Sequence, residues 1–311
     1  MDKVGRFESM EQKPKTKEEY LALIKQYFPE VKFEISELFT NGWDNNAVIL
    51  DNRLVFRFPK REWVPFKAEV RLLKYLVPKL PISVPDYIYL PEDLSFGGYK
   101  MLHGEQMRPE FFSNLSEDQK ITVAQQLGSF LSALHLTPLQ VIKDAGFDGE
   151  VGDYRWSKNN IGKLFKEAQE KVFAQLNSAE IGWIKYQFEK YLSLSFDIDT
   201  VVAHSDFTSD HILFDKEEEK ITGILDFTDI RLYDSALDFA GLWDYGNWLP
   251  EKAISYYTGR VNKDFLQRSK ITRLLGMIGN MLDVINGEDL PVTFEQSKEE
   301  LRKIMESGLT L

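Results

Sequence analysis

Two acidic loops between short apolar runs constrain this chain more than any other feature. The runs have the length and the bounding turn residues of β-strands and lie at residues 201–203, 212–214 and 221–225. Asp206 and His211 stand at either end of the first loop, and Asp226 opens the second. The charged segment 215–220 predicts a hairpin turn, which would bring Asp226 back beside His211, as ligands of a shared metal ion require.

Three side chains in this order suit phosphoryl transfer. That chemistry needs one carboxylate to orient the attacking hydroxyl and accept its proton, plus ligands that hold magnesium against the nucleotide phosphates. Asp206, His211 and Asp226 supply these groups. A simple hairpin with solvated turn aspartates is the alternative, because Asp is common in turns. The repetition of strand and acidic loop, with both His204 and His211 in the first loop, favours the catalytic interpretation.

At these residues the chain resembles the aminoglycoside phosphotransferases, which have a protein-kinase-like fold, and most closely their 2″-phosphotransferase branch. That branch typically shows His-x-Asp-Phe-Ser-x-x-His, which His204 to His211 match with Thr208 in place of Ser. The resemblance implies that Asp206 is the catalytic base, that His204 holds the loop, and that His211 and Asp226 bind Mg²⁺. Because magnesium prefers oxygen ligands, we expect Asp226 to be the dominant one.

Composition is consistent with a soluble enzyme. A chain of 311 residues exceeds the usual size of one domain, so we expect two lobes with a cleft between them. The absence of cysteine excludes disulfides and thiolate metal sites and fits the cytoplasm. No secretory signal is evident at the start, and no apolar run approaches the roughly 20 residues that cross a bilayer, so no membrane partner is expected.

The net charge of -11 argues against nucleic-acid binding, which relies on a basic surface. It would favour a cationic substrate, although acidity can also serve solubility alone. The sequence carries no signal for an oligomeric state.

Strand-like runs dominate up to residue 102 and helical periodicities follow. The expected strands are residues 33–39, 47–50, 54–58, 86–90 and 98–102. Two helices are expected to start at the capping boxes of Thr16 and Ser116. Helical periodicity predicts five more, over residues 65–76, 160–176, 181–192, 237–245 and 265–285. His135, at the end of the helix that follows Ser116, is expected in the core or as a cap. The predicted class is α+β, a bilobal protein-kinase-like fold with a small antiparallel-sheet N-lobe (1–102) and a larger, mostly helical C-lobe (103–311).

Arg57 and Glu69 are predicted to pair in the N-lobe. The strand period of two places Arg57 opposite the apolar face formed by Phe56 and Phe58, and therefore in the cleft. Glu69 shares a helical stripe with buried leucines and needs a cation. This resembles the strand lysine and helix glutamate that position nucleotide phosphates in kinases, with Arg in place of Lys. Lys60 is an alternative for this role, and a purely structural ion pair stays open.

Two further segments are candidates for nucleotide binding. Residues 41–46 lie where a kinase places its phosphate-covering hairpin, but they contain one glycine and no Gly-x-Gly-x-x-Gly, so an ordinary tight turn explains them equally well. The strand from Gly97 to Leu102 resembles the hinge whose backbone pairs with a purine edge, which makes Lys100 and Leu102 candidates. Either ATP or GTP fits this scheme.

The acceptor is predicted from the resemblance. Asp234 and Asp238 resemble the family's structural aspartates. Asp229 and Asp244 could face a cationic acceptor. Trp243 fits helical packing, although an aromatic ring near a cleft could also stack on a sugar. The 2″ branch is carboxylate-rich after Asp238, whereas here the segment 241–248 leaves Asp244 as the main acid. We predict a kinase that transfers the γ-phosphate of ATP or GTP to the 2″ hydroxyl of a cationic aminoglycoside. A sugar, amino alcohol or macrolide kinase, or a non-catalytic kinase-like binding module, is the alternative.

Overall fold

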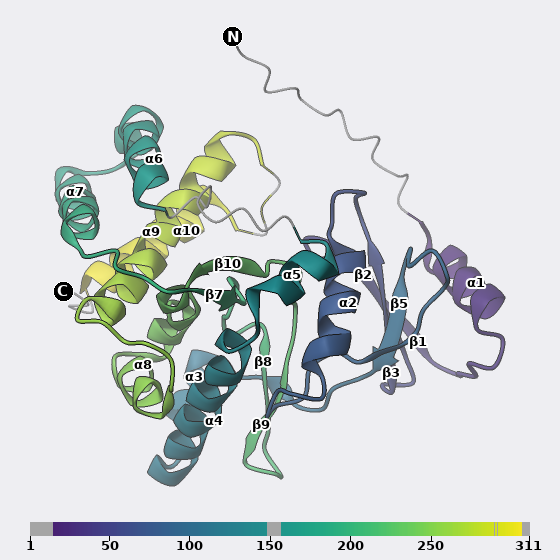
Figure 1. Ribbon diagram of the computed structural model, residues 1–311. Helices are drawn as coiled ribbons and strands as arrows, with labels where there is room; N and C mark the ends of the chain where they lie inside the picture. The colour runs from purple at the N-terminus through teal and green to yellow at the C-terminus, as the bar shows by residue number, and fades with distance from the viewer. Residues whose placement is uncertain (1–14, 148–156, 289, 291, 307–311) are drawn as a thin grey trace.

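A five-stranded antiparallel sheet in the order β1-β2-β3-β5-β4 forms the N-terminal region (Figure 1). The computed structural model describes residues 15–147, 157–288, 290 and 292–306, so residues 1–14, on which the secretory-signal expectation rests, lie outside. The strands are β1 (Ser36–Phe39), β2 (Asn45–Leu50), β3 (Leu54–Pro59), β4 (Tyr87–Tyr89) and β5 (Gly97–Lys100). The predicted strands are thus confirmed, with their ends shifted by a few residues.

Two helices cover opposite faces of this sheet. Phe56 and Phe58 pack with α1 (Lys17–Tyr27) in one hydrophobic cluster. Val55, on the other face of β3, packs against the cluster that contains α2 (Phe66–Leu76). The alternation expected for β3 is therefore confirmed, and it places Arg57 on the α2 side.

Both capping boxes predicted from the sequence are present. Thr16 Oγ1 accepts from the Glu19 backbone N–H, and Glu19 Oε2 accepts from the Thr16 backbone N–H at 2.7 Å. Ser116 and Gln119 make the same reciprocal contacts at the start of α4 (Glu117–His135). Each box satisfies two backbone donors that a helix start would otherwise leave unpaired.

The chain leaves the sheet after Lys100 and joins the C-terminal region through β6 (Glu105–Gln106), which pairs with β8 (Ile212–Asp215). The predicted hairpin is confirmed, because β8 pairs with β9 (Lys220–Ile224) across the turn. Strand β7 (Thr200–Ala203) pairs instead with β10 (Arg231–Asp234). The loop with Asp206 therefore connects two different sheets.

The remaining C-terminal elements are mostly helical. They are α3 (Pro109–Ser113), α5 (Leu139–Ala145), α6 (Lys158–Lys171), η1 (Phe173–Gln175), α7 (Ser178–Ser193), η2 (Ser235–Phe239), η3 (Gly241–Tyr245), α8 (Trp248–Ala253), η4 (Ile254–Tyr256), α9 (Phe265–Ile285) and α10 (Phe294–Glu306). Helix α9 has its predicted bounds. The helix predicted over residues 237–245 is wrong: two short 3₁₀ turns stand there, because Gly241 is pressed against the Phe207 carbonyl and the chain must bend around it.

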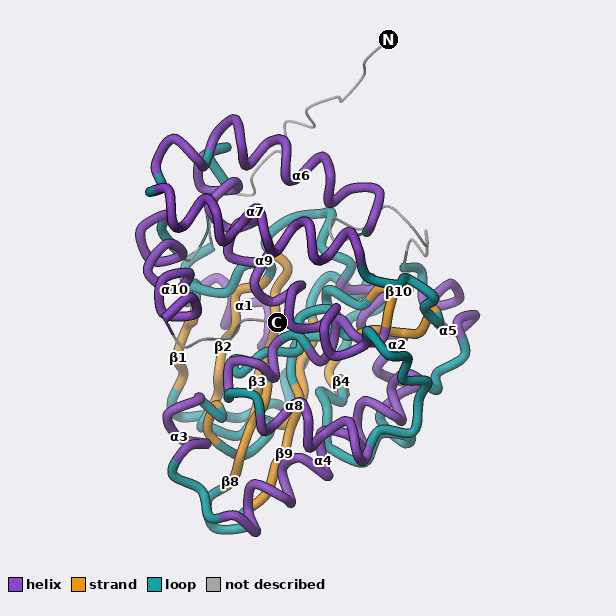
Figure 2. Tube along the Cα trace, turned by 90° about the vertical axis from the view of Figure 1, so that its left-hand side faces the viewer, coloured by secondary structure: helices purple, strands orange, loops and turns teal. Residues whose placement is uncertain are grey.

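Three hydrophobic clusters make up the described core. One lies between α1 and the sheet, and the largest runs from α2 through β7, β8, β9 and β10 to α4. The third is formed by α6, α7, α9 and α10, which lie on the side of the molecule away from α1 (Figures 1 and 2). This arrangement confirms the expected small antiparallel-sheet region followed by a larger helical one.

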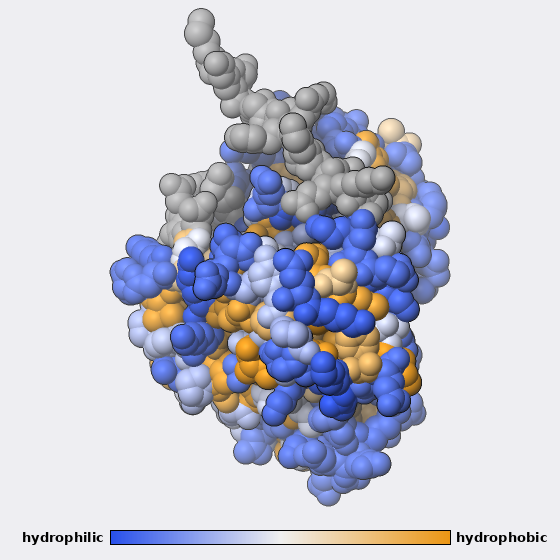
Figure 3. All heavy atoms as spheres, turned by 90° about the vertical axis from the view of Figure 1, so that its right-hand side faces the viewer, coloured by the Kyte–Doolittle hydropathy of each residue, from blue (hydrophilic) through white to orange (hydrophobic). Residues whose placement is uncertain are grey.

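The surface of the N-terminal region is predominantly hydrophilic, with separate hydrophobic patches (Figure 3). Large hydrophobic side chains are exposed there singly or in small groups: Tyr27, Ile35, Phe39, Trp43, Trp63 and Ile88. Among the described helices, none combines the length and the apolar character needed to span a membrane.

Candidate active site

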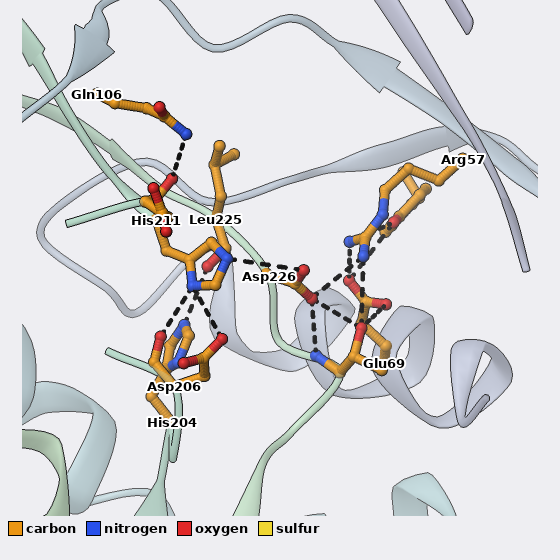
Figure 4. Close-up of polar contacts among 11 residues, drawn as sticks. Arg57, Glu69, Gln106, His204, Asp206, His211, Leu225 and Asp226 are labelled. Carbon is orange, nitrogen blue, oxygen red and sulfur yellow. Dashed lines mark hydrogen bonds and ion pairs between the residues drawn. The ribbon is translucent and has the colours of Figure 1, made fainter. Parts of the chain in front are cut away.

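The loop between β7 and β8 holds Asp206 and His211 close together (Figure 4). His211 Nδ1 donates to the Asp206 backbone oxygen at 2.8 Å and lies 3.4 Å from the Asp206 carboxylate. In the neutral imidazole this hydrogen bond places the proton on Nδ1, so that Nε2 keeps its lone pair. Nε2 points toward Asp226, whose Oδ2 atom lies 3.9 Å away. The predicted proximity of His211 and Asp226 is therefore observed.

Asp238 fixes the backbone of this loop from the core. It is fully buried, and its two carboxylate oxygens accept from the backbone N–H groups of His204 at 2.7 Å and Ser205 at 2.8 Å. Ser205 has a φ of 70°, a left-handed conformation that non-glycine residues adopt at a cost. His135 Nε2 lies 2.9 Å from Asp238 Oδ2, so this buried histidine is a core residue that supports the aspartate.

His204 joins the two acidic loops. Its ring is completely buried, and its Nε2 donates to the Leu225 carbonyl at 3.0 Å. Burial lowers the pKa of His204, which keeps the ring neutral. His204 thus acts as the scaffold residue that the resemblance implied, and it does so by holding the residue before Asp226.

Asp226 lies between the His211 side and the Arg57 side of the site (Figure 4). Its Oδ1 accepts from Arg57 Nη2 at 3.1 Å and from Thr228 Oγ1 at 2.8 Å. Burial opposes its charge, but Arg57, His211 and Thr228 hold the pKa of the Asp226 carboxyl well below its usual range. Its backbone is also left-handed, with φ of 60°. Asp226 is therefore ionised, with Oδ2 turned toward His211.

The predicted pair of Arg57 and Glu69 is present and extends to Asp226. Arg57 Nη1 donates to Glu69 Oε1 at 2.7 Å, while Nη2 reaches Asp226. Glu69 is fully buried, and burial raises its pKa to about 7 although Arg57 opposes the rise. Arg57 therefore connects a helix of the N-terminal region with the second acidic loop.

Sequence reasoning missed two polar partners in this cluster. Thr228 Oγ1 contacts both Asp226 and Glu69, and Tyr87 Oη lies within 3.4 Å of Arg57. The position of Thr228 two residues after an aspartate is typical of a local side-chain turn and was an available signal. Nothing in the sequence near Tyr87 indicated its contact, because the two residues meet only across the sheet.

Of the segment 41–46, residues 45 and 46 belong to β2, and the others turn from β1 into it. Asp44 in this turn lines one pocket together with Thr228 and Asp229. A Cβ atom on Gly42 would lie 2.6 Å from the Asn45 carbonyl, so the turn requires glycine. Lys60 Nζ donates to the carbonyls of Thr40 at 2.6 Å and Gly42 at 2.5 Å. Lys60 thus binds this loop and stands outside the Arg57 cluster. Burial, followed by the carboxylates of Asp229 and Asp226, raises the pKa of Asp44 to about 6.

The expected hinge lies at the junction of the two regions. Leu102 packs near Gly223 of β9, where an added Cβ would approach its side chain to 3.0 Å. Lys100, the last residue of β5, has an exposed side chain. Gly98 is needed in β5 because a Cβ there would meet the Phe56 ring at 2.5 Å.

The acceptor candidates have cationic partners. Asp229 pairs with Arg231 at 3.3 Å, and Asp244 pairs with Arg273 Nε at 2.6 Å. Trp243 is 7 % exposed and donates to Ser269 Oγ. Its ring therefore packs in the core.

Asp234 caps a short helix and forms a buried ion pair. Asp234 caps η2 by accepting from the Ala236 N–H and binds the buried Arg268 with both carboxylate oxygens. This confirms that Asp234 anchors a helix start, although the helix is a short 3₁₀ turn.

This two-region fold and this arrangement of acidic loops define the class of kinase-like phosphotransferases. The chain matches the model of the phosphotransferase enzyme family over residues 36–269, and it belongs to that family.

Solved structures of aminoglycoside phosphotransferases have the same fold. The GDP and kanamycin complex of APH(2")-IIia is 23 % identical, with 94 % of this chain and 99 % of that chain covered and a TM-score of 0.82. The GDP complex of wild-type aminoglycoside 2'-phosphotransferase-IIIa is 22 % identical, with 94 % and 100 % covered and a TM-score of 0.83. Macrolide 2'-phosphotransferase MphH from Brachybacterium faecium is 19 % identical, with 91 % and 96 % covered and a TM-score of 0.65.

Proposed function

We propose that this enzyme transfers the γ-phosphate of a nucleoside triphosphate to a hydroxyl group of a small molecule. The supporting observation is the line of groups from Glu69 through Arg57 and Asp226 to His211 and Asp206. Phosphoryl transfer requires a protein mainly to position the reactants and to stabilise the charge on the phosphates, and these side chains can do both.

Each group has a role in this proposal. Arg57, held by Glu69, binds the nucleotide phosphates. Asp206 orients the acceptor hydroxyl and takes its proton as the oxygen attacks the γ-phosphorus. The bond between that phosphorus and the β-phosphate oxygen breaks, and the nucleoside diphosphate leaves. His204 and Asp238 keep Asp206 in place through the backbone.

The donor set suits magnesium bound together with a nucleotide. Asp226 Oδ2 and His211 Nε2 face each other, while Asp226 Oδ1 is already engaged by Arg57 and Thr228. In the described parts of the chain, no group of three or more metal-binding side chains is present. Magnesium commonly takes one or two carboxylates and completes its shell with phosphates and water. When bound, it would neutralise charge on the phosphates.

We also propose where the two lobes meet and where the purine of the nucleotide binds. We place the boundary between the N-lobe (1–102) and the C-lobe (103–311) after Leu102, which is supported by the switch from β5 to β6. The purine would lie against the backbone of residues 100–102. Similar enzymes are known with bound GDP, ATP or ADP, so ATP and GTP are both proposed donors.

Two acceptor classes are proposed. An aminoglycoside 2″ hydroxyl is supported by the likeness to APH(2") enzymes solved with kanamycin and gentamicin. Another hydroxylated compound is favoured by a specific observation: Asp229 and Asp244, the carboxylates expected to bind amino groups, are paired with Arg231 and Arg273.

The test is γ-phosphate transfer with magnesium and either ATP or GTP, offered to kanamycin, gentamicin, a macrolide and simple sugars. Asp206→Ala should lower kcat by at least about a hundredfold, because it removes the proton acceptor. Asp210→Asn is the matched control, since Asp210 lies in the same loop but pairs with Arg108 at the surface. Equal turnover by the Asp206 variant and the wild type would refute the assignment of the base.

A further inference from the structure

Arg273 presents unused hydrogen-bond donors beside the catalytic loop. Its Nε donates to Asp244 Oδ1 at 2.6 Å, and the two side chains are 25 % and 20 % exposed. Within the described residues, the Nη groups of Arg273 make no hydrogen bond. A guanidinium held by one carboxylate at Nε keeps its Nη groups available for a second oxygen ligand.

Asp244, the partner of Arg273, lies on η3, which packs against the loop that carries Asp206. Turn η3 begins at Gly241, where an added Cβ would lie 2.1 Å from the Phe207 carbonyl, so η3 touches the residue after Asp206. Asp244 follows three residues later. Burial opposes the charge on Arg273, but the carboxylates of Asp244, Glu300 and Asp206 raise its pKa above the ordinary value.

Arg273 and Arg57 serve different sides of the site. Arg57 contacts Asp226, whereas Arg273 pairs with Asp244 on η3, the turn that packs against the loop carrying Asp206. In phosphoryl transfer the attacking oxygen of the acceptor and the leaving oxygen of the nucleotide lie roughly in line, on opposite sides of the phosphorus. If the nucleotide lies on the Arg57 side, the acceptor lies on the side that Arg273 borders.

The two carboxylates predicted to bind the acceptor are paired with arginines although the chain is acidic overall. Asp244 is matched by Arg273, and Asp229 by Arg231. Lys270, one turn before Arg273 on α9, holds its ammonium 5.0 Å from the centre of the Trp243 ring. A polycationic acceptor would need unpaired carboxylates to bind its amino groups. Positive side chains at the site would instead repel such an acceptor.

We infer that Arg273 determines acceptor specificity, and that the acceptor is a hydroxylated compound with an anionic oxygen group, a carboxylate or a phosphate. The Nη donors bind two of its oxygens, a geometry that guanidinium and carboxylate or phosphate share. Asp244 is the positioning residue that holds the guanidinium. The inference rests on the proposed kinase function and narrows its acceptor.

Matched acceptors test it with the full chain, magnesium and ATP or GTP. One series is glucose, glucuronate and glucose 6-phosphate; the other is glycerol, glycerate and glycerol phosphate; kanamycin is the cationic comparison. We expect an anionic member to exceed its neutral parent at least about tenfold in kcat/KM, which corresponds to about 1.4 kcal/mol, one charged contact. Kanamycin should be the poorest acceptor.

Variants then separate specificity from structure. Arg273→Gln should raise KM for the anionic acceptor about tenfold while kcat and the nucleotide KM stay unchanged, because binding is lost equally in the ground and transition states. The KM of Arg273→Lys should lie between those of the wild type and Arg273→Gln, since Lys keeps the positive charge but not the paired donors of the guanidinium. Arg302→Gln is the control, because Arg302 Nε also binds a carboxylate, that of Glu180, at 2.6 Å, but joins α10 to α7.

The inference is overturned if kanamycin or a neutral parent is the better acceptor, or if Arg273→Gln behaves like Arg302→Gln. It is equally overturned if no anionic compound is phosphorylated while nucleotide binding, measured by calorimetry, is intact. Loss of nucleotide binding itself would refute the proposed kinase function instead.

Discussion

His204 Nε2 donates to the carbonyl oxygen of Leu225 at 3.0 Å, which ties the loop of Asp206 to the residue that precedes Asp226. The ring is buried and neutral, and its donor acts together with the Leu225 N–H, which donates to the His211 carbonyl at 2.8 Å, in setting the spacing of the two carboxylates. A kinase-type site needs that spacing to be constant, because small displacements of reacting groups cost large factors in rate.

His204→Phe keeps an aromatic ring of similar volume and removes the donor. We expect kcat to fall about tenfold or more and the free energy of unfolding to fall by about 1–3 kcal/mol, because the Leu225 carbonyl loses its partner. Steady-state kinetics and urea unfolding measure both effects. His103→Phe, at an exposed position, is the control and should change neither. An unchanged kcat in His204→Phe would mean that the link does not set the geometry.

Asp238→Asn should be much more costly than Asp215→Asn. Asp238 uses both oxygens for the backbone N–H groups of His204 and Ser205, so an amide must turn a donor toward one of them. We expect a loss of about 2 kcal/mol or more in urea unfolding. Asp215 accepts two backbone N–H groups with Oδ1 alone, and Asn retains that oxygen. Similar losses in the two variants would contradict this account.

Glu69→Gln should change the pH dependence of stability. Burial raises the pKa of Glu69 to about 7 from an ordinary 4.5. Between these two pH values the folded protein holds a proton that the unfolded chain releases. The stability that protonated Glu69 contributes is therefore fully present below about pH 4.5 and is lost as the pH rises through about 7. As the pH rises from 4.5 to 7, the wild type should thus lose stability that the variant keeps. The melting temperature of the variant should rise relative to that of the wild type, and the difference in the free energy of unfolding should reach at most about 3 kcal/mol. A relative loss over this range would reverse the sign and refute the shift.

Gly241→Ala should damage the catalytic loop. The new Cβ would lie 2.1 Å from the Phe207 carbonyl, so either η3 or the loop must move. We expect a loss of about 1–3 kcal/mol in thermal unfolding together with a fall in kcat. Gly276→Ala provides the contrast, because nothing lies within 4 Å of a Cβ there and α9 should gain up to about 1 kcal/mol. Equal effects would show that the contact at Gly241 carries no strain.

The sequence predicted those features that depend on local periodicity. The alternation in β3 placed Arg57 on the cleft side, the helical stripe placed Glu69 opposite it, and the charged turn paired β8 with β9. These relationships need only neighbouring residues, so strand and helix periods suffice to predict them.

Contacts between distant segments could not be predicted in this way. Asp244 was expected to be available, but its partner Arg273 lies on a later helix, and no periodicity connects the two. Lys60 was considered for the phosphates and instead binds the loop carbonyls of Thr40 and Gly42. The bend after Phe239 followed from the close approach of Gly241 to Phe207, which depends on tertiary packing.

The separate hydrophobic cluster of α6, α7, α9 and α10 has an evolutionary consequence. Substitutions in α6, α7 and α10 leave the packing around β7, β8, β9 and β10 intact, because those strands belong to another cluster. Helix α9 takes part in both clusters through Phe265 and Ile271, and it also carries Arg273. If Arg273 determines the acceptor as inferred above, a lineage with this architecture can exchange one acceptor for another through a few changes on α9 and its neighbours, while the residues proposed to transfer phosphate are inherited unchanged.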